Sequence, residues 1–318
     1  MDADATTPDA NGRRLPDSPN GKREATSRPT EPAGLNVGFI GLGDMGGRIA
    51  LRILQGGFAL TVHDTRPGAC RRLQERGAIV AADARALARS CSVIGICVVD
   101  DHQLCEVVAQ MRGQLADGTI VLIHSSVMPD IAKKVAAELA EEGVTVIDAP
   151  VSGSRPAADA GTLTVFAGGD ATTIDQVAAL LDTFAANVVH AGQVGSGQAL
   201  KIVNNVMLHM NHLVALEAVR FARSQGIDEA TLIGATNIST GRSWVTETWG
   251  LIDAMVDDHP LAGTDAIYPL MSKELWHAVE LGRTTMTPVP LTALGTQLSE
   301  QYFRDRADDL KVDAPAQS

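Results

Sequence analysis

Residues 37–46 read Val-Gly-Phe-Ile-Gly-Leu-Gly-Asp-Met-Gly, a short apolar run followed by a Gly-x-Gly-x-x-Gly turn. We expect the apolar run to form a strand and a helix to begin near Met45. In this arrangement Gly41 permits a tight turn, Gly43 lets a phosphate approach the backbone, and Gly46 lets the helix lie close to the strand. Free N–H groups at the start of such a helix favour a bound anion. The stretch therefore predicts a strand–turn–helix unit that binds the diphosphate of a dinucleotide.

A second apolar segment, residues 58–63, ends at Asp64. An acidic residue roughly 20 positions after the glycines is where a carboxylate meets the adenosine ribose. Asp64 favours NAD over NADP, because a carboxylate accepts from the 2′-hydroxyl and repels a 2′-phosphate. Arg66 either opposes this preference by holding a phosphate in a forked geometry or is a solvated loop residue. The residues expected to bind the cofactor in this region are Gly41, Leu42, Gly43, Asp44, Met45, Gly46, Asp64 and Arg66.

The chain has 318 residues and a formal net charge of -12. Its length suits two domains with a sizeable core. The acidic balance disfavours nucleic acid and anionic membranes as partners, because both select for basic surfaces. No run of about 18 consecutive apolar residues occurs, so no transmembrane helix is expected. A small anionic ligand is compatible with this charge, because a few local cations and N–H groups can dominate a cleft.

The four cysteines show no Cys-x-x-Cys spacing and no flanking ligand pattern. We interpret them as reduced thiols of a cytoplasmic protein. His209 and His212 are three positions apart in a helical stretch, but no third metal ligand lies near them in the sequence. We therefore expect buried or interface histidines and no metal site.

The pattern of apolar residues divides the chain into a region of alternating strands and helices and a helical region. Residues 35–195 alternate short apolar strands with helical segments, which predicts a doubly wound, mainly parallel Rossmann sheet. Residues 196–305 read as an all-helical C-terminal domain. Its first helix, residues 197–225, is apolar on most faces, so we expect it to be buried, partly by another subunit of a homodimer or homotetramer. We expect a disordered tail over residues 1–34, without a signal peptide, and a frayed tail over residues 306–318.

Lys201 and Asn205 lie near the start of this long helix, four positions apart and so on one face. A lysine in an otherwise apolar helix is costly without a purpose, although it can also extend its ammonium group to solvent. The preceding glycines, Gly192, Gly195 and Gly197, suit a close approach of the backbone to another group.

Two polar clusters follow expected strands, where ligands bind in open α/β sheets. Ser125 and Ser126 follow a strand that ends at Ile123, although one serine is also explained as a helix N-cap. Residues 148–154 read Asp-Ala-Pro-Val-Ser-Gly-Ser. The N–H groups of such a Ser-Gly turn can bind a carboxylate, or the segment is a plain loop.

Four separate motifs follow one another along the sequence. They are residues 41–46; residues 148–153, continuing through Ala-Gly-Thr-Leu-Thr at 160–164; residues 192–197 with Lys-Ile-Val-Asn-Asn at 201–205; and Lys-Glu-Leu at 273–275. Together they resemble the β-hydroxyacid dehydrogenases, the family of 3-hydroxyisobutyrate dehydrogenase and tartronate semialdehyde reductase. The resemblance covers roughly residues 36–300.

The resemblance implies a role for each matching residue. Lys201 matches the catalytic lysine, and Asn205 matches the asparagine that orients the lysine and the substrate. Further matches are Ser152 and Gly153 in the turn that anchors the substrate carboxylate, Ser125 beside substrate and nicotinamide, and Lys273, which closes over the cofactor. The chain departs from the family where Ser154 replaces a glycine, Arg155-Pro156-Ala157 stands at a common Gly-Ala pair, and Glu274 and His124 replace aspartates.

The family resemblance implies an NAD(P)-dependent oxidoreductase that transfers hydride between nicotinamide and a short β-hydroxyacid or its semialdehyde. Lys201 would be the general acid and base, with a pKa lowered by its apolar surroundings. Two alternatives stay open. One is an imine reductase that uses NADPH, which usually lacks a lysine at this position. The other is a non-catalytic nucleotide-binding scaffold.

Overall fold

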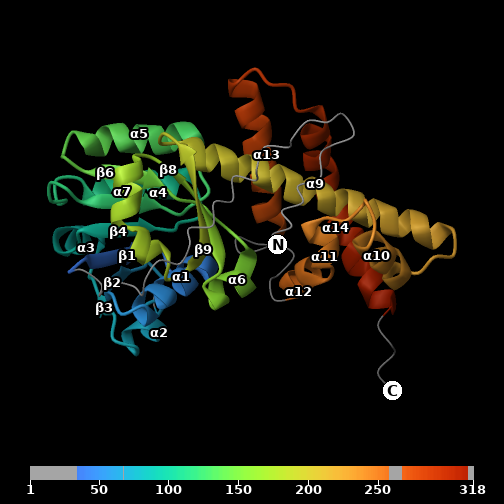
Figure 1. The fold of residues 1–318 in the computed structure, drawn as a ribbon, viewed down its shortest axis with the longest axis horizontal. Helices are drawn as coiled ribbons and strands as arrows, with labels where there is room; N and C mark the ends of the chain where they lie inside the picture. The colour runs from blue at the N-terminus through green and yellow to red at the C-terminus, as the bar shows by residue number, and fades with distance from the viewer. Residues whose placement is uncertain (1–33, 67, 258–266, 314–318) are drawn as a thin grey trace, which may run out of the picture.

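The computed structural model describes residues 34–66, 68–257 and 267–313 (Figure 1). Apart from residue 34, the expected disordered tail lies outside the described residues. Nine strands form one sheet within the described part of the chain, in the order β3-β2-β1-β4-β5-β6-β8-β7, with β9 beside β8. The strands are β1 (Asn36–Ile40), β2 (Ala59–His63), β3 (Ile79–Val80), β4 (Val93–Ile96), β5 (Ile120–Ile123), β6 (Thr145–Asp148), β7 (Val151–Ser152), β8 (Leu163–Gly168) and β9 (Ala185–Gly192).

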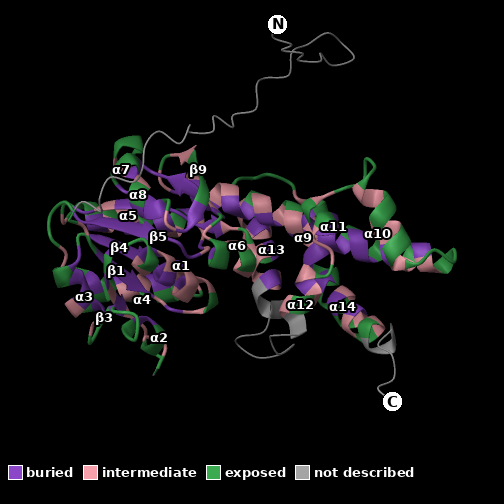
Figure 2. Ribbon diagram, turned by 60° about the horizontal axis from the view of Figure 1, so that its bottom comes forward, coloured by how far each residue is buried: buried purple, intermediate pink, exposed green. Residues whose placement is uncertain are grey.

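Neighbouring strands from β3 through β6 are parallel, and β8 is antiparallel to β6 and β7 but parallel to β9. This confirms the expected mainly parallel sheet. Every residue of β4 and β5 is buried, because helices cover both faces of the sheet (Figure 2). The first helices are α1 (Asp44–Gln55), α2 (Arg71–Gln74), α3 (Ala84–Ser90), α4 (Asp101–Met111), α5 (Pro129–Ala140), α6 (Ser154–Ala160), α7 (Ala171–Gln176) and α8 (Ala178–Leu181).

Two apolar cores sandwich the sheet. Side chains of α1, α7 and α8, including Ile49, Ile174 and Leu181, pack on one face. Side chains of α3, α4 and α5, including Leu104 and Val135, pack on the other. A sheet with helices on both faces is the doubly wound arrangement that the alternating pattern predicts.

Strands end with β9 at Gly192, and the described chain is helical from Ser196 onward. Figure 1 shows α9 running from the sheet into a group of helices. These helices are α9 (Ser196–Ser224), α10 (Glu229–Asn237), α11 (Trp244–Glu247), α12 (Leu251–Asp257), α13 (Ile267–Thr284) and α14 (Pro290–Asp313). The predicted all-helical C-terminal region is therefore confirmed.

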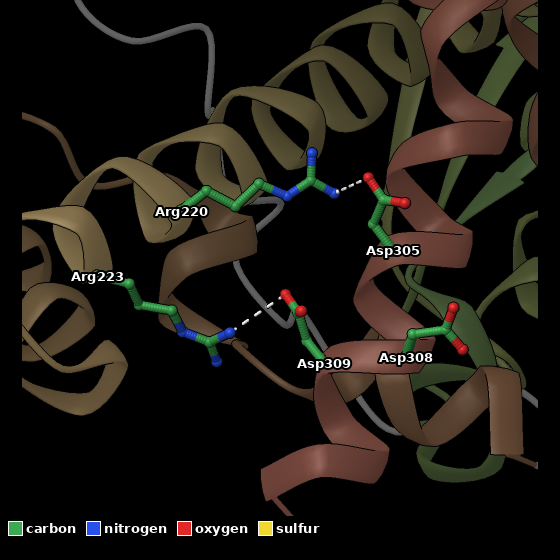
Figure 3. Close-up of a pocket in the computed structure, with 5 residues that line it drawn as sticks. All are labelled: Arg220, Arg223, Asp305, Asp308 and Asp309. Atoms are coloured by element: carbon green, nitrogen blue, oxygen red, sulfur yellow. Dashed lines mark ion pairs between the residues drawn. The ribbon is translucent and has the colours of Figure 1, made fainter.

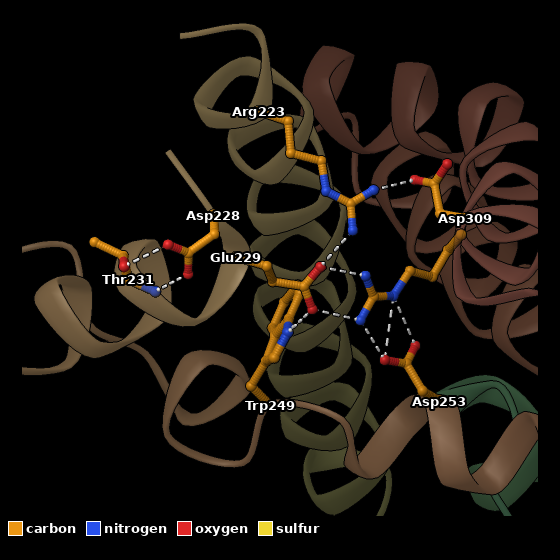
Figure 4. A network of polar contacts seen from close by, with 8 residues as sticks. Arg223, Asp228, Glu229, Thr231, Trp249, Asp253 and Asp309 are labelled. Atoms are coloured by element: carbon orange, nitrogen blue, oxygen red, sulfur yellow. Dashed lines mark hydrogen bonds and ion pairs between the residues drawn. The ribbon is translucent and has the colours of Figure 1, made fainter. Parts of the chain in front are cut away.

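The expectation of a frayed tail from residue 306 is wrong for residues 306–313, which continue α14. Arg306 is buried, and its guanidinium donates to Glu229 at 2.7 and 2.8 Å and to Asp253 at 2.7 Å. The indole Nε1 of Trp249 donates to the same Glu229 carboxylate (Figure 4). These bonds fasten α14 to α10 and α12. Residues 314–318 lie outside the described part.

Other segments show finer local structure. After β8, the chain forms the short helices α7 and α8 before β9 begins. Residues 148–154, for which a plain loop was the alternative, contain the end of β6, the strand β7 and the first residue of α6. On the long helix α9, Val203, Met207 and Phe221 are 53%, 64% and 70% exposed in the single chain, and the expected burial of this face by another subunit stays a prediction.

Candidate active site

The predicted site residues gather at one edge of the sheet. Strands β1, β2, β4, β5 and β6 are parallel, so their carboxyl ends meet there. The glycine turn follows β1, Asp64 follows β2, and Ser125 follows β5. Ligands of open α/β sheets bind outside this edge.

The glycine turn has the geometry that a diphosphate needs. Gly41 has φ +89°, and a Cβ there would lie 2.2 Å from the carbonyl oxygen of Cys97. A Cβ on Gly46 would lie 2.1 Å from the carbonyl oxygen of Gly41, so α1 packs directly on the turn. A Cβ on Gly43 would meet only the Arg66 guanidinium, at 4.0 Å. Space is therefore open at Gly43, beside a helix start that no side chain caps.

The remaining residues of the glycine turn are Leu42, Asp44 and Met45. Leu42 is buried, and its N–H donates to Oδ2 of Asp64 at 2.7 Å. Asp44, the first residue of α1, accepts from Nε of Arg155 at 2.6 Å and pairs with Arg48. Arg155 therefore links α6 to the start of α1. Met45 follows in the first turn of α1.

Asp64 is held in place by its neighbours. The Arg66 backbone N–H donates to Oδ1 at 2.8 Å, and the guanidinium donates to both carboxylate oxygens at 3.1 Å. Burial raises the pKa of Asp64, but the bonds from Arg66 and Leu42 outweigh it, so the pKa lies below its ordinary value. The carboxylate is therefore ionised where an adenosine ribose would lie.

Asp148 clamps the start of α9 to the sheet. Its buried carboxylate accepts the N–H of Gly195 through Oδ1 and that of Gln198 through Oδ2, both at 2.7 Å. Burial raises the pKa of this carboxyl, and the N–H donors work in the opposite direction. Gln198 adds two bonds to the loop after β5, donating to the Ser125 carbonyl at 2.8 Å and accepting from the Val127 N–H at 3.1 Å. These contacts hold the first turn of α9 at the carboxyl ends of β5 and β6.

Beyond this clamp, α9 reverses the usual amphipathic pattern. Its buried face carries polar side chains at spacings of three and four, Gln198, Lys201, Asn205, His209 and His212. Lys201 is 9% exposed, and Asn205 is 2% exposed. Burial lowers the pKa of Lys201, and the negative charge of Glu274 opposes this shift. Lys201 is therefore a partly desolvated amine at the junction of the sheet and the helices, not a side chain extended to solvent.

The serines differ in their surroundings. Ser125 is buried, and its hydroxyl oxygen accepts the Val98 N–H at 2.7 Å. Ser152 ends β7, and its hydroxyl oxygen accepts from Nδ2 of Asn204 at 3.3 Å. The same Asn204 amide lies 3.4 Å from Oδ1 of Asn205. The Ser152–Gly153 turn thus connects to the residues on α9, with Gly153 at φ +132°.

Helix α13 faces this site. Nζ of Lys273 donates to the Val99 carbonyl at 2.6 Å, which joins α13 to the loop after β4. Glu274 accepts from Nε2 of His209 at 2.7 Å. Burial raises the pKa of Glu274, but the His209 bond and the charge of Lys201 outweigh it and lower the pKa. The charges of Lys201 on α9 and Glu274 on α13 therefore act on each other, with Asn205 one turn after Lys201.

A surface hollow lies elsewhere. It has a volume of about 360 Å³ and lies between α9 and α14 (Figure 3), lined by Arg220, Arg223, Asp305, Asp308 and Asp309. Ion pairs cross it, from Arg220 to Asp305 at 2.7 Å and from Arg223 to Asp309 at 3.1 Å. Both arginines are thus already paired with aspartates, so we assign the hollow no ligand. Across the described residues, no cluster of three His, Cys, Asp or Glu side chains suits a metal, and no helix is long and apolar enough to cross a membrane.

Sequence reasoning missed several residues of this junction. Asp148 was part of a recognised motif, but its contact with α9 was not foreseen. A charged residue at the end of an otherwise apolar strand was the available signal. Helical spacing places His209 on the face of Lys201 and Asn205, but its contact with Glu274 was not predicted. Gln198 lies on the same face, three positions before Lys201, and extending the spacing toward the start of the helix would have found it.

A dinucleotide-binding sheet edge with a buried lysine beside it defines a class of two-part nucleotide-dependent enzymes. Two family models match the chain. The NAD binding domain of 6-phosphogluconate dehydrogenase matches residues 36–192, and the NAD-binding part of NADP-dependent 3-hydroxyisobutyrate dehydrogenase matches residues 195–316.

Curated relatives agree with these models. Mitochondrial 3-hydroxyisobutyrate dehydrogenase of Drosophila melanogaster is 32% identical over 273 residues, 83% of each chain. An NAD-dependent L-serine dehydrogenase of Pseudomonas aeruginosa is 30% identical and covers 82% of this chain and 90% of its own. The solved 3-hydroxyisobutyrate dehydrogenase of Mycobacterium tuberculosis with L-serine has a TM-score of 0.76 at 24% identity, over 86% of this chain and 94% of its own.

The chain belongs to the β-hydroxyacid dehydrogenase family, as its motifs indicated. The predicted class, an NAD(P)-dependent oxidoreductase acting on a CH–OH group, is confirmed. A Streptomyces aurantiacus imine reductase has a TM-score of 0.60 at 21% identity, over 84% of this chain and 93% of its own, which shows a shared fold alone.

Proposed function

We propose that this chain oxidises a short β-hydroxyacid with NAD, or reduces its semialdehyde, with Lys201 as the general acid and base. The observation that carries the proposal is the buried Lys201 amine on the clamped start of α9, with Asn205 one turn further along. The open space at Gly43 and the uncapped start of α1 fit a bound dinucleotide.

The nicotinamide and Lys201 have separate roles in the proposed reaction. When bound, the nicotinamide accepts or donates the hydride. In oxidation the substrate C–H bond loses that hydride, the C–O bond becomes a carbonyl, and the hydroxyl proton passes to Nζ of Lys201. In reduction the protonated amine returns that proton and stabilises the developing alkoxide. A lowered pKa makes the neutral amine more abundant near neutral pH, which the oxidation requires.

The substrate proposal uses the polar groups around Lys201. The N–H groups of the Ser152–Gly153 turn and the Ser152 hydroxyl, which accepts from Asn204, offer donors for a carboxylate. Ser125, which follows β5, matches the family's serine beside the nicotinamide. Relatives named for 3-hydroxyisobutyrate and for L-serine suggest these two acids as first substrates to test. Both carry a hydroxyl on the carbon next but one to the carboxylate.

Replacing Lys201 by alanine tests the catalytic assignment. We expect Lys201→Ala to lose about 10²- to 10⁴-fold in kcat, the usual share of a general acid and base, and to keep its affinity for NAD. Lys134→Ala removes an exposed lysine of α5 and serves as the control with unchanged turnover. Near-normal turnover of Lys201→Ala would refute the assignment. NAD binding by the unsubstituted protein without turnover of any β-hydroxyacid would favour the scaffold alternative, and NADPH-dependent turnover of a cyclic imine would favour an imine reductase.

The preference for NAD over NADP is also a proposal, supported by the ionised Asp64 carboxylate. The second family model is named for an NADP-dependent enzyme, so the two cofactors need direct comparison. We expect NAD to bind at least tenfold more tightly than NADP in a fluorescence titration. Asp64→Ala should lose most of this discrimination, because the carboxylate that repels a 2′-phosphate is removed while the Arg66 guanidinium stays. Tighter binding of NADP by the unsubstituted protein would contradict the proposal.

A homodimer or homotetramer is supported by the exposed face of α9. Val203, Met207, Val214 and Phe221 recur there at spacings of four and seven, as in a helix seam that packs against another helix. Leu291 of α14 is 72% exposed as well. Analytical ultracentrifugation should show a dimer or tetramer, and Met207→Glu should dissociate it. A monomeric unsubstituted protein would contradict this proposal.

A cytoplasmic location is supported by four free cysteines, which suit a reducing compartment. Cell fractionation tests it, and recovery in a membrane or secreted fraction would count against it.

A further inference from the structure

The buried polar face of α9 continues past Lys201 and Asn205 to His209, which is 4% exposed. Nε2 of His209 lies 2.7 Å from Oε2 of Glu274 on α13. Nδ1 of this ring is buried and has no hydrogen-bond partner among the residues that the structure describes. Within the described structure, the imidazole ring of His209 therefore makes its hydrogen bond to Glu274.

Glu274 also interacts electrostatically with two lysines. Its side chain is 17% exposed, and the positive charges of Lys201 and Lys273 act on its carboxylate. Glutamate is one methylene longer than the aspartate usual in the family, so its carboxylate extends further from α13. A carboxylate in this setting stabilises the protonated form of Lys201 most strongly when it is free to turn toward the amine.

We propose that His209 is a positioning residue that holds the Glu274 carboxylate and so limits how strongly Lys201 retains its proton. This inference rests on the proposed function of Lys201 as general acid and base. With the bond from His209 in place, one carboxylate oxygen is occupied, and the pull of Glu274 on the lysine is restrained. Without that bond the carboxylate turns to Lys201, and the lysine serves as a base only at higher pH.

Other charged groups face this cluster and stay unchanged in the test. Lys273 and His277 lie on α13, and the charges of Asp100 and Asp101, at the start of α4, act on Lys273. Asp101 and Glu274 also act on His277. His212 lies on α9, and its charge interacts with that of His209. These groups are the same in every His209 variant, so a shift of the pH profile that His209→Asn shows and His209→Gln does not is attributable to the bond with Glu274.

A pair of amide variants tests the proposal. In His209→Gln the amide nitrogen can reach the position of Nε2, whereas in His209→Asn the side chain is too short. We would measure kcat/KM for oxidation of L-serine and 3-hydroxyisobutyrate with saturating NAD from about pH 6 to about pH 10, around the range of a lowered lysine pKa. In His209→Asn the acidic limb of the profile should move up by about one pH unit, with about tenfold lower kcat/KM near neutral pH. His209→Gln should recover most of this loss.

Two further variants separate positioning from simple stability. Glu274→Gln removes the negative charge, so its acidic limb should move down, opposite to that of His209→Asn. His212→Asn changes a buried histidine on the same helix that packs on Trp249 and Phe303. His212→Asn should lower the melting temperature without moving the acidic limb of the kcat/KM profile.

The inference is overturned if the limb of His209→Asn coincides with that of the unsubstituted protein, or if His212→Asn shifts it equally. If His209→Asn does not fold, Glu274→Gln decides, and a limb that fails to move down overturns the inference. Lys201→Ala, measured in parallel, separates the two proposals. Retained turnover there defeats the proposed function, whereas lost turnover with an unmoved His209→Asn limb defeats only the role of His209.

Discussion

Replacing Asp148 by asparagine tests whether one carboxylate holds the start of α9. Its two oxygens each accept a backbone N–H, from Gly195 and Gln198, at 2.7 Å inside the protein. Asparagine keeps the shape but turns an NH₂ group toward one of these donors. The variant loses a charge-assisted hydrogen bond and leaves a buried N–H without a partner, a cost of about 3 kcal/mol. The melting temperature should fall by about 6 °C or more.

The loss should extend to catalysis, because Lys201 lies in the turns that this clamp positions. A displacement of about 1 Å at a reacting group can cost on the order of 10²-fold, so we expect kcat of Asp148→Asn to fall at least tenfold. The affinity for NAD should change little, since the glycine turn belongs to β1 and α1. Scanning calorimetry, steady-state kinetics and an NAD titration measure the three quantities.

Asp228→Asn is the matched control. Asp228 is exposed and caps α10 by accepting the Thr231 N–H at 2.8 Å. Asparagine caps helices about as well as aspartate, so this variant should lose well under 1 kcal/mol and keep its kcat. If Asp148→Asn matches Asp228→Asn in melting temperature and kcat, the clamp has no energetic or catalytic importance and the reasoning is refuted.

Two more predictions concern stability. Burial lowers the pKa of His124 and of His212 to about 4, so each contributes stability above the ordinary pKa of 6.5 that is lost as the pH falls toward 4. Urea unfolding should show about 2 kcal/mol lost per histidine between pH 7.5 and pH 5, and His212→Leu should halve this pH dependence; a pH-independent free energy would refute it. Ser154 has φ +61° and a buried hydroxyl without a partner in the described structure, so Ser154→Gly should raise the free energy of unfolding by about 1 kcal/mol, whereas a lower melting temperature would contradict the strain.

Local patterns predicted the nucleotide-binding half well. Residues 37–46 form the expected strand, turn and helix, because Gly41 and Gly46 allow backbone contacts that no side chain could fit. Alternation of apolar strands and helices predicted the sheet, since each strand buried on both faces reads as an apolar run. The prediction of a frayed tail from residue 306 was wrong because the polar, acidic sequence there gave no sign that Arg306 has two carboxylate partners inside the helical group.

The sequence alone determined most of the strands and helices and placed Lys201 and Asn205 on one helical face, because helix and strand periodicities are local properties. Only the tertiary structure decided what meets that face. Asp148 is separated from Gly195 by 47 positions, and His209 from Glu274 by 65. No local periodicity encodes such pairings, because they arise only when α9 docks on the sheet and α13 packs across it, which gives these charges partners that replace water.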